Sequence, residues 1–215
     1  MKKKHSFHQE RAFTLIEVLL ASLIMGVVGF ILSDILSRSF KSNDKVQLTS
    51  NIKQSGQTAL NIISETVRDS DKIICPLSAS TPFKVIVLKK YDTDKTKNVF
   101  TRFRICAQSD PSNCAGGNNG FISIDSPPVD QNNEIALTNL CLPDYQSPNA
   151  SKLIDNDLNT GVSIVDGKFE YSSFDPTNRL VLVRLDIGPS IQSRSGYENQ
   201  IPGGFITFQT TVQKR

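Results

Sequence analysis

The sequence predicts an α+β protein, in which a long N-terminal helix with a membrane-spanning first half packs its second half on an antiparallel β-sheet. Three observations lead to this prediction. No proline interrupts residues 1–75 of the 215-residue chain. Apolar residues in that part recur at helical spacing. Beyond Pro76 the apolar and polar residues alternate in short runs, which is typical of half-buried strands.

Residues 13–36 are almost entirely apolar and follow a short basic segment that contains Lys2, Lys3 and Lys4. The interior of this run, from Val18 to Leu32, has no charged residue. Twenty-four helical residues span about 36 Å, enough to cross the hydrocarbon core of a bilayer. The lysines are expected to stay in the cytoplasm, which makes the chain a single-pass protein of the inner membrane with its bulk outside.

Two interpretations of the apolar run compete, and Glu17 separates them. An ordinary secretory signal peptide needs a small-residue cleavage site after the run, but Ser33-Asp34-Ile35-Leu36-Ser37 provides none. Glu17 lies four residues past Phe13, at the cytoplasmic edge of the membrane. A carboxylate there costs about 2–3 kcal/mol or more unless it is paired. A newly formed α-amino group is a natural partner.

The N-terminal residues also resemble a known signature. Arg11-Ala12-Phe13-Thr14-Leu15-Ile16-Glu17-Val18-Leu19-Leu20 resembles the prepilin motif of type IV pilins and type II secretion pseudopilins. The resemblance implies that a prepilin peptidase cleaves between Ala12 and Phe13 and N-methylates Phe13. It also implies that Glu17 pairs with the N-terminal amine of a neighbouring subunit during assembly. A generic membrane anchor in which Glu17 occurs by chance is the alternative.

Two departures from the family pattern narrow the expected role. Ala12 replaces the glycine that usually precedes the cleavage site. Major pilins usually carry a helix-kinking proline about two-thirds along the apolar run or just beyond, whereas Asp34 lies near that place here. A minor pilin or pseudopilin is therefore favoured. Residues 57–70 are also similar to the helix of PilW-type minor pilins and J-type pseudopilins, in which a small-apolar pair precedes an apolar pair, an acid and an arginine.

The segment after Leu36 is polar but keeps an apolar stripe, spaced for one helical face: Leu48, Ile52, Ala59, Ile63 and Val67. The helix is expected to continue to about Ser70, with Gly26, Gly29 and Gly56 as weak points, and Cys75-Pro76 is expected to end it. The chain then divides into four parts: a leader 1–12, a transmembrane or filament-core helix 13–36, its amphipathic continuation 37–74, and an extracytoplasmic β-rich head 75–215.

Alternating runs in the head predict its strands: Phe83–Lys90, Asn98–Cys106, Phe121–Asp125, Glu134–Leu142, Arg179–Ile187 and Gly204–Gln213. Asp166-Gly167 is expected to form a type I′ turn that joins Val162–Val165 and Lys168–Phe174 in a hairpin. Residues 188–203 are expected to form a long polar loop.

Four cysteines lie beyond the apolar run: Cys75, Cys106, Cys114 and Cys141. None forms a CxxC, and the only histidines are His5 and His8, so the spacing does not fit a zinc site. An even cysteine count behind an export segment predicts disulfides, with buried free thiols as the alternative. Cys106–Cys114 is the favoured pair because a turn-rich loop separates the two, although all three connectivities stay open.

The sequence predicts neither an enzyme nor a bound cofactor. Both histidines lie in the predicted leader, which excludes a Ser-His-Asp site in the mature chain. Phosphate loops and dinucleotide-binding glycine patterns are absent from the sequence. Asp155, Asp157 and Asn159 carry calcium-type oxygen ligands. Gly161 is one place late for an EF-hand, however, so these residues are weak calcium candidates and a solvated turn is the alternative.

The charge distribution bears on the expected partners. The net charge of +3 is concentrated in the first 12 residues, so the rest of the chain is formally neutral and no basic body for nucleic acid is indicated. A basic run in the head resembles DNA-binding surfaces of some pilins, but Asp92 and Asp94 offset it and such runs commonly mark solvated sheet edges. Its members are Lys84, Lys89, Lys90, Lys95, Lys97, Arg102 and Arg104.

A DNA partner is therefore not expected. The expected partners are the prepilin peptidase, other pilin subunits in a filament, and the inner-membrane assembly platform. The rival hypothesis is a non-assembling, single-pass membrane-anchored extracytoplasmic binding protein.

Overall fold

The computed structural model describes ten segments of the chain: residues 14–75, 83–91, 98–109, 119–127, 139–141, 150–154, 157–158, 161–171, 180–192 and 201–213. The chain divides into two compact units, Met1–Val46 and Gln47–Arg215. The first holds the N-terminal part of the long helix. The second, called the head below, holds the rest of that helix and the strands.

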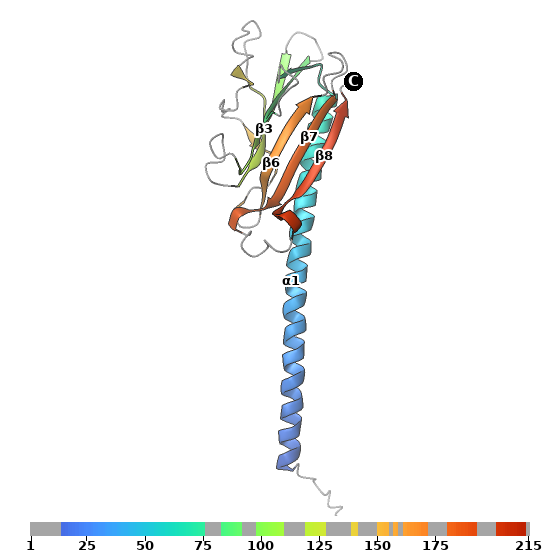
Figure 1. Ribbon diagram of the computed structural model, residues 1–215, viewed down its shortest axis with the longest axis vertical. Coiled ribbons are helices and arrows are strands. Elements are labelled where there is room, and N and C mark those ends of the chain that lie inside the picture. Colours follow the sequence, from blue (N-terminus) through green and yellow to red (C-terminus); the bar gives the residue numbers. More distant parts are fainter. Residues whose placement is uncertain are drawn as a thin grey trace, which may run out of the picture. The chain divides into compact units, whose positions relative to one another are not determined.

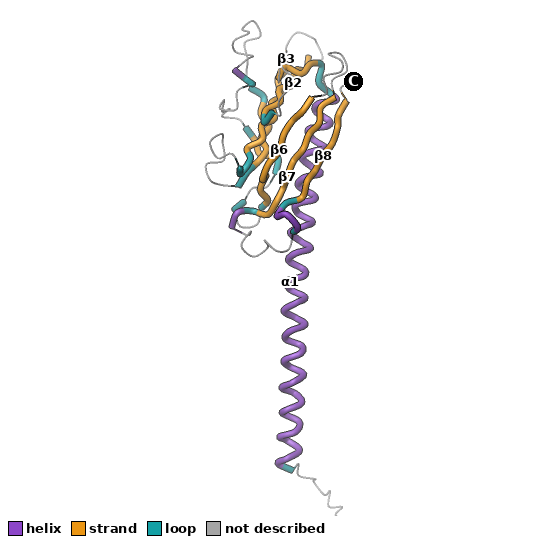
Figure 2. The backbone as a smooth tube through the Cα atoms, viewed as in Figure 1, coloured by secondary structure: helices purple, strands orange, loops and turns teal. Residues whose placement is uncertain are grey.

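The helix α1 is unbroken from Leu15 to Arg68 (Figure 2). This confirms the predicted long helix and shows that none of its glycines interrupts it. The helix stops at Arg68, within two residues of the predicted end near Ser70, but Cys75-Pro76 does not end it, contrary to the prediction. Ser70 Oγ donates to the carbonyl of Val67 at 2.7 Å, which satisfies one of the last helical carbonyls. Lys72–Cys75 then form the strand β1.

The larger sheet has the order β1-β2-β3-β4-β5, with every neighbouring pair antiparallel. Its other members are β2 Val85–Tyr91, β3 Asn98–Cys106, β4 Phe121–Asp125 and β5 Ser151–Lys152. The smaller antiparallel sheet has the order β6-β7-β8 and consists of β6 Val162–Tyr171, β7 Leu180–Pro189 and β8 Ile206–Gln213. Figure 1 shows this sheet lying alongside the C-terminal part of α1. The observed architecture is therefore α+β, as the sequence predicted.

The predicted hairpin at Asp166-Gly167 is wrong. Both residues lie inside β6, where they pair with Asp186 and Leu185 of β7, and a register shift falls just before them. A larger residue would be crowded there, because a Cβ on Gly167 would lie 3.0 Å from the carbonyl oxygen of Arg184. A glycine within a strand thus marks a bulge and a close approach here, as it can elsewhere, and not a chain reversal.

Two smaller expectations also changed. In the expected strand Glu134–Leu142, the described residues 139–141 form a helical turn and not a strand. In the expected loop 188–203, β7 extends to Pro189, and a short 3-10 helix at Pro202–Gly204 precedes β8. The remaining strand predictions agree with β2, β3, β4, β7 and β8 within a few residues.

The main core of the head lies between the apolar stripe of α1 and the two sheets. Every member of the predicted stripe is buried, and Gly56 is buried with them. From β7, alternate residues Val181, Val183, Leu185 and Ile187 contribute fully buried side chains. Phe83, between β1 and β2, exchanges backbone hydrogen bonds with Phe169 of β6 and so connects the two sheets.

Candidate functional site

The N-terminal end of α1 positions the residue that the sequence singled out for assembly. The carbonyl of Thr14 accepts hydrogen bonds from the backbone N–H groups of Glu17, at 3.0 Å, and Val18, at 3.2 Å, which closes the first turn. Glu17 therefore lies in that first turn, where a carboxylate interacts favourably with the helix dipole, and it is exposed. Ala12 and Phe13, the predicted cleavage site, lie outside the described residues.

The helix around and beyond Glu17 presents an apolar surface that the described part of the chain does not cover. Large side chains such as Leu15, Met25 and Phe30 are 76–79% exposed. The apolar window of this helix has a mean hydropathy of 2.6, and none of it is buried. The polar hydroxyl of Ser22 is satisfied within the helix by the carbonyl of Leu19, at 2.8 Å. By length and composition this segment is suited to a single-pass membrane anchor near the N-terminus.

The apolar segment ends at a charged pair on the helix. Arg38 Nε lies 3.0 Å from Asp34 Oδ2, an i, i+4 contact on an exposed surface. Asp34 takes the place near which major pilins usually carry proline, and α1 stays helical through it. Gly26 and Gly29 lie upstream, and a Cβ on either one would meet no atom within 4 Å.

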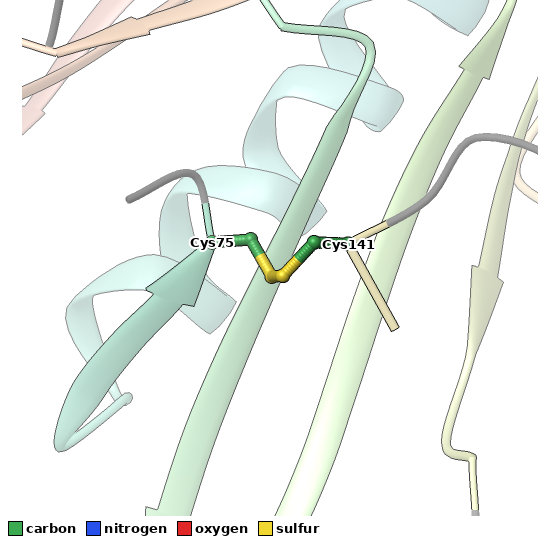
Figure 3. The surroundings of a disulfide bond; sticks show 2 residues. All are labelled: Cys75 and Cys141. Atoms are coloured by element: carbon green, nitrogen blue, oxygen red, sulfur yellow. A yellow bond between two sulfur atoms is a disulfide. The ribbon is translucent and has the colours of Figure 1, made fainter. Parts of the chain in front are cut away.

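A disulfide joins the end of strand β1 to the turn at residues 139–141 of the head. Cys75, the last residue of β1, is bonded to Cys141, with Cα atoms 5.7 Å apart (Figure 3). The sequence had left three connectivities open, and the structure contains this pair. Leu140, next to Cys141, packs with Cys75, Val85, Val87 and Phe100 in a second small core. Cys106 is also disulfide-bonded, whereas Cys114 lies outside the described residues, so the Cys106–Cys114 pair stays a prediction.

The two arginines of the basic run do not lie on a solvated edge of the sheet. Arg102 and Arg104 lie on the interior strand β3 and are 1% and 6% exposed. Arg102 Nε donates to Asp125 Oδ1 at 3.0 Å, and Arg102 Nη2 contacts the other carboxylate oxygen. Sequence reasoning missed this buried pair because alternation within β3 suggested only that the arginines share one face. Lys95 and Lys97 lie outside the described residues.

Two lysines of the same run, the half-buried Lys84 and the exposed Lys90, also have acidic partners. Lys84 Nζ donates to the carboxylate of Asp166 and to the carbonyl of Gly167, the latter at 2.7 Å. Burial raises the pKa of the Asp166 carboxyl, but hydrogen bonds from Lys84 and Gly167 outweigh it, so its pKa lies below the ordinary value. The hydrogen bond to Asp69 raises the pKa of Lys90. These contacts tie β2 and its flank to β6 and to the end of α1.

Of the weak calcium candidates, only Asp157 lies among the described residues. Its carbonyl accepts hydrogen bonds from Asn119 Nδ2 at 2.8 Å and from the Gly161 N–H at 3.1 Å. Asn119 is fully buried, and its Oδ1 accepts from the Ile191 N–H at 2.7 Å, so this side chain joins three loops. Within the described segments, no group of three or more His, Cys, Asp or Glu residues could hold a metal ion.

The head also carries an open groove of about 710 Å³ between the polar side of α1 and β8. Its lining is polar: Asn61, Ser64, Glu65, Arg68, Asp69 and Thr210. Asp69 is already bound by Lys90. The groove therefore lacks the apolar lining with a few convergent polar groups that is typical of small-molecule sites.

Comparison with known proteins supports the interpretation of the N-terminal segment. Residues 7–33 match the family model of the prokaryotic N-terminal methylation motif. This match covers the end of the predicted leader, Glu17 and most of the exposed apolar surface. Neither the curated proteins nor the solved structures gave a match.

Proposed function

We propose that this chain is a minor pilin or pseudopilin, a structural subunit of a type IV pilus or type II secretion filament. One observation carries the proposal. The methylation motif at 7–33 coincides with a helix whose apolar surface is uncovered and whose single charged residue before Asp34 is Glu17. A general membrane anchor has no need of a carboxylate at that depth, since burying one is costly.

The proposed maturation explains how Glu17 is used. A prepilin peptidase removes the leader 1–12 and N-methylates Phe13, which places a positive amine four residues from Glu17. The amine of one subunit then neutralises Glu17 of its neighbour as the helix leaves the membrane. Close packing between the apolar helices replaces the lipid contacts that each helix loses, and the charge pair fixes the axial offset between neighbours.

The unbroken course of α1 supports a minor rather than a major subunit. The helix has no proline between Leu15 and Arg68, and it runs through Asp34 without interruption. The head, in which the Cys75–Cys141 disulfide ties the end of β1 to the turn at residues 139–141, would then decorate the filament. Its role is structural in this proposal, and the assembly platform and the other pilins are its partners.

Mass spectrometry of the membrane-extracted protein tests the proposal. The expected N-terminus is N-methyl-Phe13, which appears only when the prepilin peptidase is co-expressed. Ala12→Gly should speed the processing or leave it unchanged, because glycine usually precedes this cleavage site in the family. An intact Met1 start in the presence of the peptidase, or cleavage after Leu32, contradicts the proposal.

The second candidate function is a membrane-anchored binding protein that does not assemble. The polar groove beside β8 is the observation that favours it, since a binding protein needs an accessible recess on its head. Processing at Ala12–Phe13 separates the two candidates, because a plain anchor would keep its basic N-terminal residues.

A further inference from the structure

Three basic side chains lie on one face of α1 immediately after the apolar segment. Arg38, Lys41 and Lys45 recur at i, i+3 and i+7, which places them within an arc of about 60° on a helix with 3.6 residues per turn. All three are exposed. We call them the basic stripe. Asp44 is the one acidic residue between Ser37 and Val46.

Two members of the basic stripe, Lys41 and Lys45, carry charges that no acidic side chain of the described residues neutralises. Arg38 is bound by Asp34, one turn earlier. In the described part of the chain, neither Lys41 nor Lys45 forms an ion pair. Residues 13–37 contain no lysine or arginine, so the basic stripe provides the first basic side chains of the processed chain.

The distance of the stripe from the apolar segment places Arg38 and Lys41 at the depth of the lipid headgroups and Lys45 just outside it. The hydrocarbon core takes about 20 helical residues, which a segment from Phe13 to Leu36 fills. Lys41 is five residues and Lys45 nine residues beyond Leu36, or about 7.5 Å and about 13.5 Å further along the helix, and the headgroup layer beyond each side of the core is about 5–8 Å thick. The backbone of Lys41 therefore lies within this layer, and that of Lys45 lies just outside it. Long lysine side chains also reach along the helix toward the membrane surface.

We propose that the basic stripe binds the phosphate groups of anionic phospholipids in the outer leaflet. Lys41 and Lys45 then hold the helix at a fixed depth in the bilayer until it is drawn into a filament. This inference rests on the proposed membrane anchoring. The occupant is a lipid and not a free phosphate ion, because only the lipid is held at this depth by the same bilayer that holds the helix. Attraction of this kind is short-ranged and screened by salt.

The test uses the full chain, reconstituted in vesicles of phosphatidylglycerol and phosphatidylcholine in equal amounts. The protein is extracted in mild detergent, and the two lipids retained with it are counted by mass spectrometry. The variant Lys41→Gln/Lys45→Gln is compared with the control Lys53→Gln/Lys72→Gln, which removes two exposed lysines from the head. All variants keep the same leader, so its lysines do not affect the comparison.

The wild type should retain more phosphatidylglycerol than phosphatidylcholine. The ratio of the two retained lipids should fall about fivefold for each stripe lysine removed, and it should stay unchanged in the control. Equal retention in both variants overturns the proposal, as does loss of the excess when inorganic phosphate is added at unchanged ionic strength. Resistance to carbonate extraction is measured in parallel. A chain that fails to insert contradicts the membrane anchor and the stripe together, whereas insertion without lipid preference contradicts the stripe alone.

Discussion

Gly56 of α1 faces the ring of Phe208 on β8 so closely that a Cβ on the glycine would lie 2.6 Å from the ring carbons Cε2 and Cζ. The sequence had marked Gly56 as a weak point in the helix. In the structure, Gly56 is instead a site of close packing. Because glycine has no side chain, the ring of Phe208 can approach the helix backbone there.

Gly56→Ala is therefore expected to lower the free energy of unfolding, by up to about 2 kcal/mol. Overpacking costs about 1–3 kcal/mol, and the better helix propensity of alanine returns about 1 kcal/mol. Denaturant unfolding of the full chain in detergent, followed by near-UV circular dichroism, measures the change. Gln57→Ala, at an exposed neighbouring position, should change the stability by less than about 0.5 kcal/mol. A more stable Gly56→Ala variant would show that the ring moves aside freely.

Loss of the Cys75–Cys141 disulfide is expected to destabilise the head strongly. The bond closes a loop of 66 residues, for which the chain-entropy model gives about 4 kcal/mol. The variant Cys75→Ala/Cys141→Ala should unfold at correspondingly lower denaturant. Non-reducing peptide mapping of the wild type checks the premise, and it also tests the predicted Cys106–Cys114 pair. A peptide that links Cys75 to a different cysteine contradicts the assignment.

The buried Arg102–Asp125 pair predicts strongly non-additive substitutions. Removing one partner leaves a buried charge without its counter-ion, so Asp125→Leu should cost about 3–5 kcal/mol. Arg102→Met/Asp125→Leu removes both charges and should recover most of that loss. Chemical unfolding of the single and double variants measures the coupling. If the double variant loses the sum of the two single effects, the pair is not the dominant interaction of either residue.

The Asp166 carboxyl predicts a modest loss of stability in acid. Its pKa in the folded protein lies below the ordinary value of about 3.9, so the folded state favours the ionised form. Its contribution is complete above that ordinary pKa and disappears as the pH falls through the lower, folded-state pKa. The pair is partly exposed, so the effect should stay below about 1 kcal/mol. Asp166→Asn should flatten this part of the stability profile, whereas a profile identical to the wild type would assign the acid sensitivity to other groups.

Glu17→Ala is expected to leave membrane insertion intact and to reduce incorporation into filaments. Insertion depends on total apolarity, which the substitution increases. Assembly in the proposed filament buries an amine that then has no partner, at a cost of several kcal/mol. The measurement is the amount of the variant in sheared filaments, with its membrane level as the control. If the variant is found in sheared filaments at the wild-type amount, Glu17 is not needed for assembly.

Much of the fold could be predicted because its signals are local. The apolar stripe from Leu48 to Val67 needs only helical periodicity, and the alternation in β3 and β7 needs only the two-residue period of a strand. Each of these patterns is complete within one element. The N-terminal motif could be predicted for the same reason, because Phe13, Glu17 and the apolar run are neighbours in the sequence.

The errors arose where a local pattern has two physical solutions. Asp166-Gly167 suits a tight turn, but the same dipeptide fits a bulged strand when Lys84 binds the aspartate and β3 and β7 approach the glycine. Cys75-Pro76 suits a helix end, but β2 supplied a partner for Lys72–Cys75 and the helix ended at Arg68.

The sequence by itself determined the long helix, the apolar anchor, the motif around Glu17 and most strands, because each depends on neighbours within a few residues. The tertiary structure alone decided that Arg102 is buried against Asp125, that Cys75 is bonded to Cys141, and that Gly56 receives Phe208. These contacts join residues 23, 66 and 152 positions apart in the chain. Their energies depend on burial and on distances between elements, which exist only after the sheets have packed on α1.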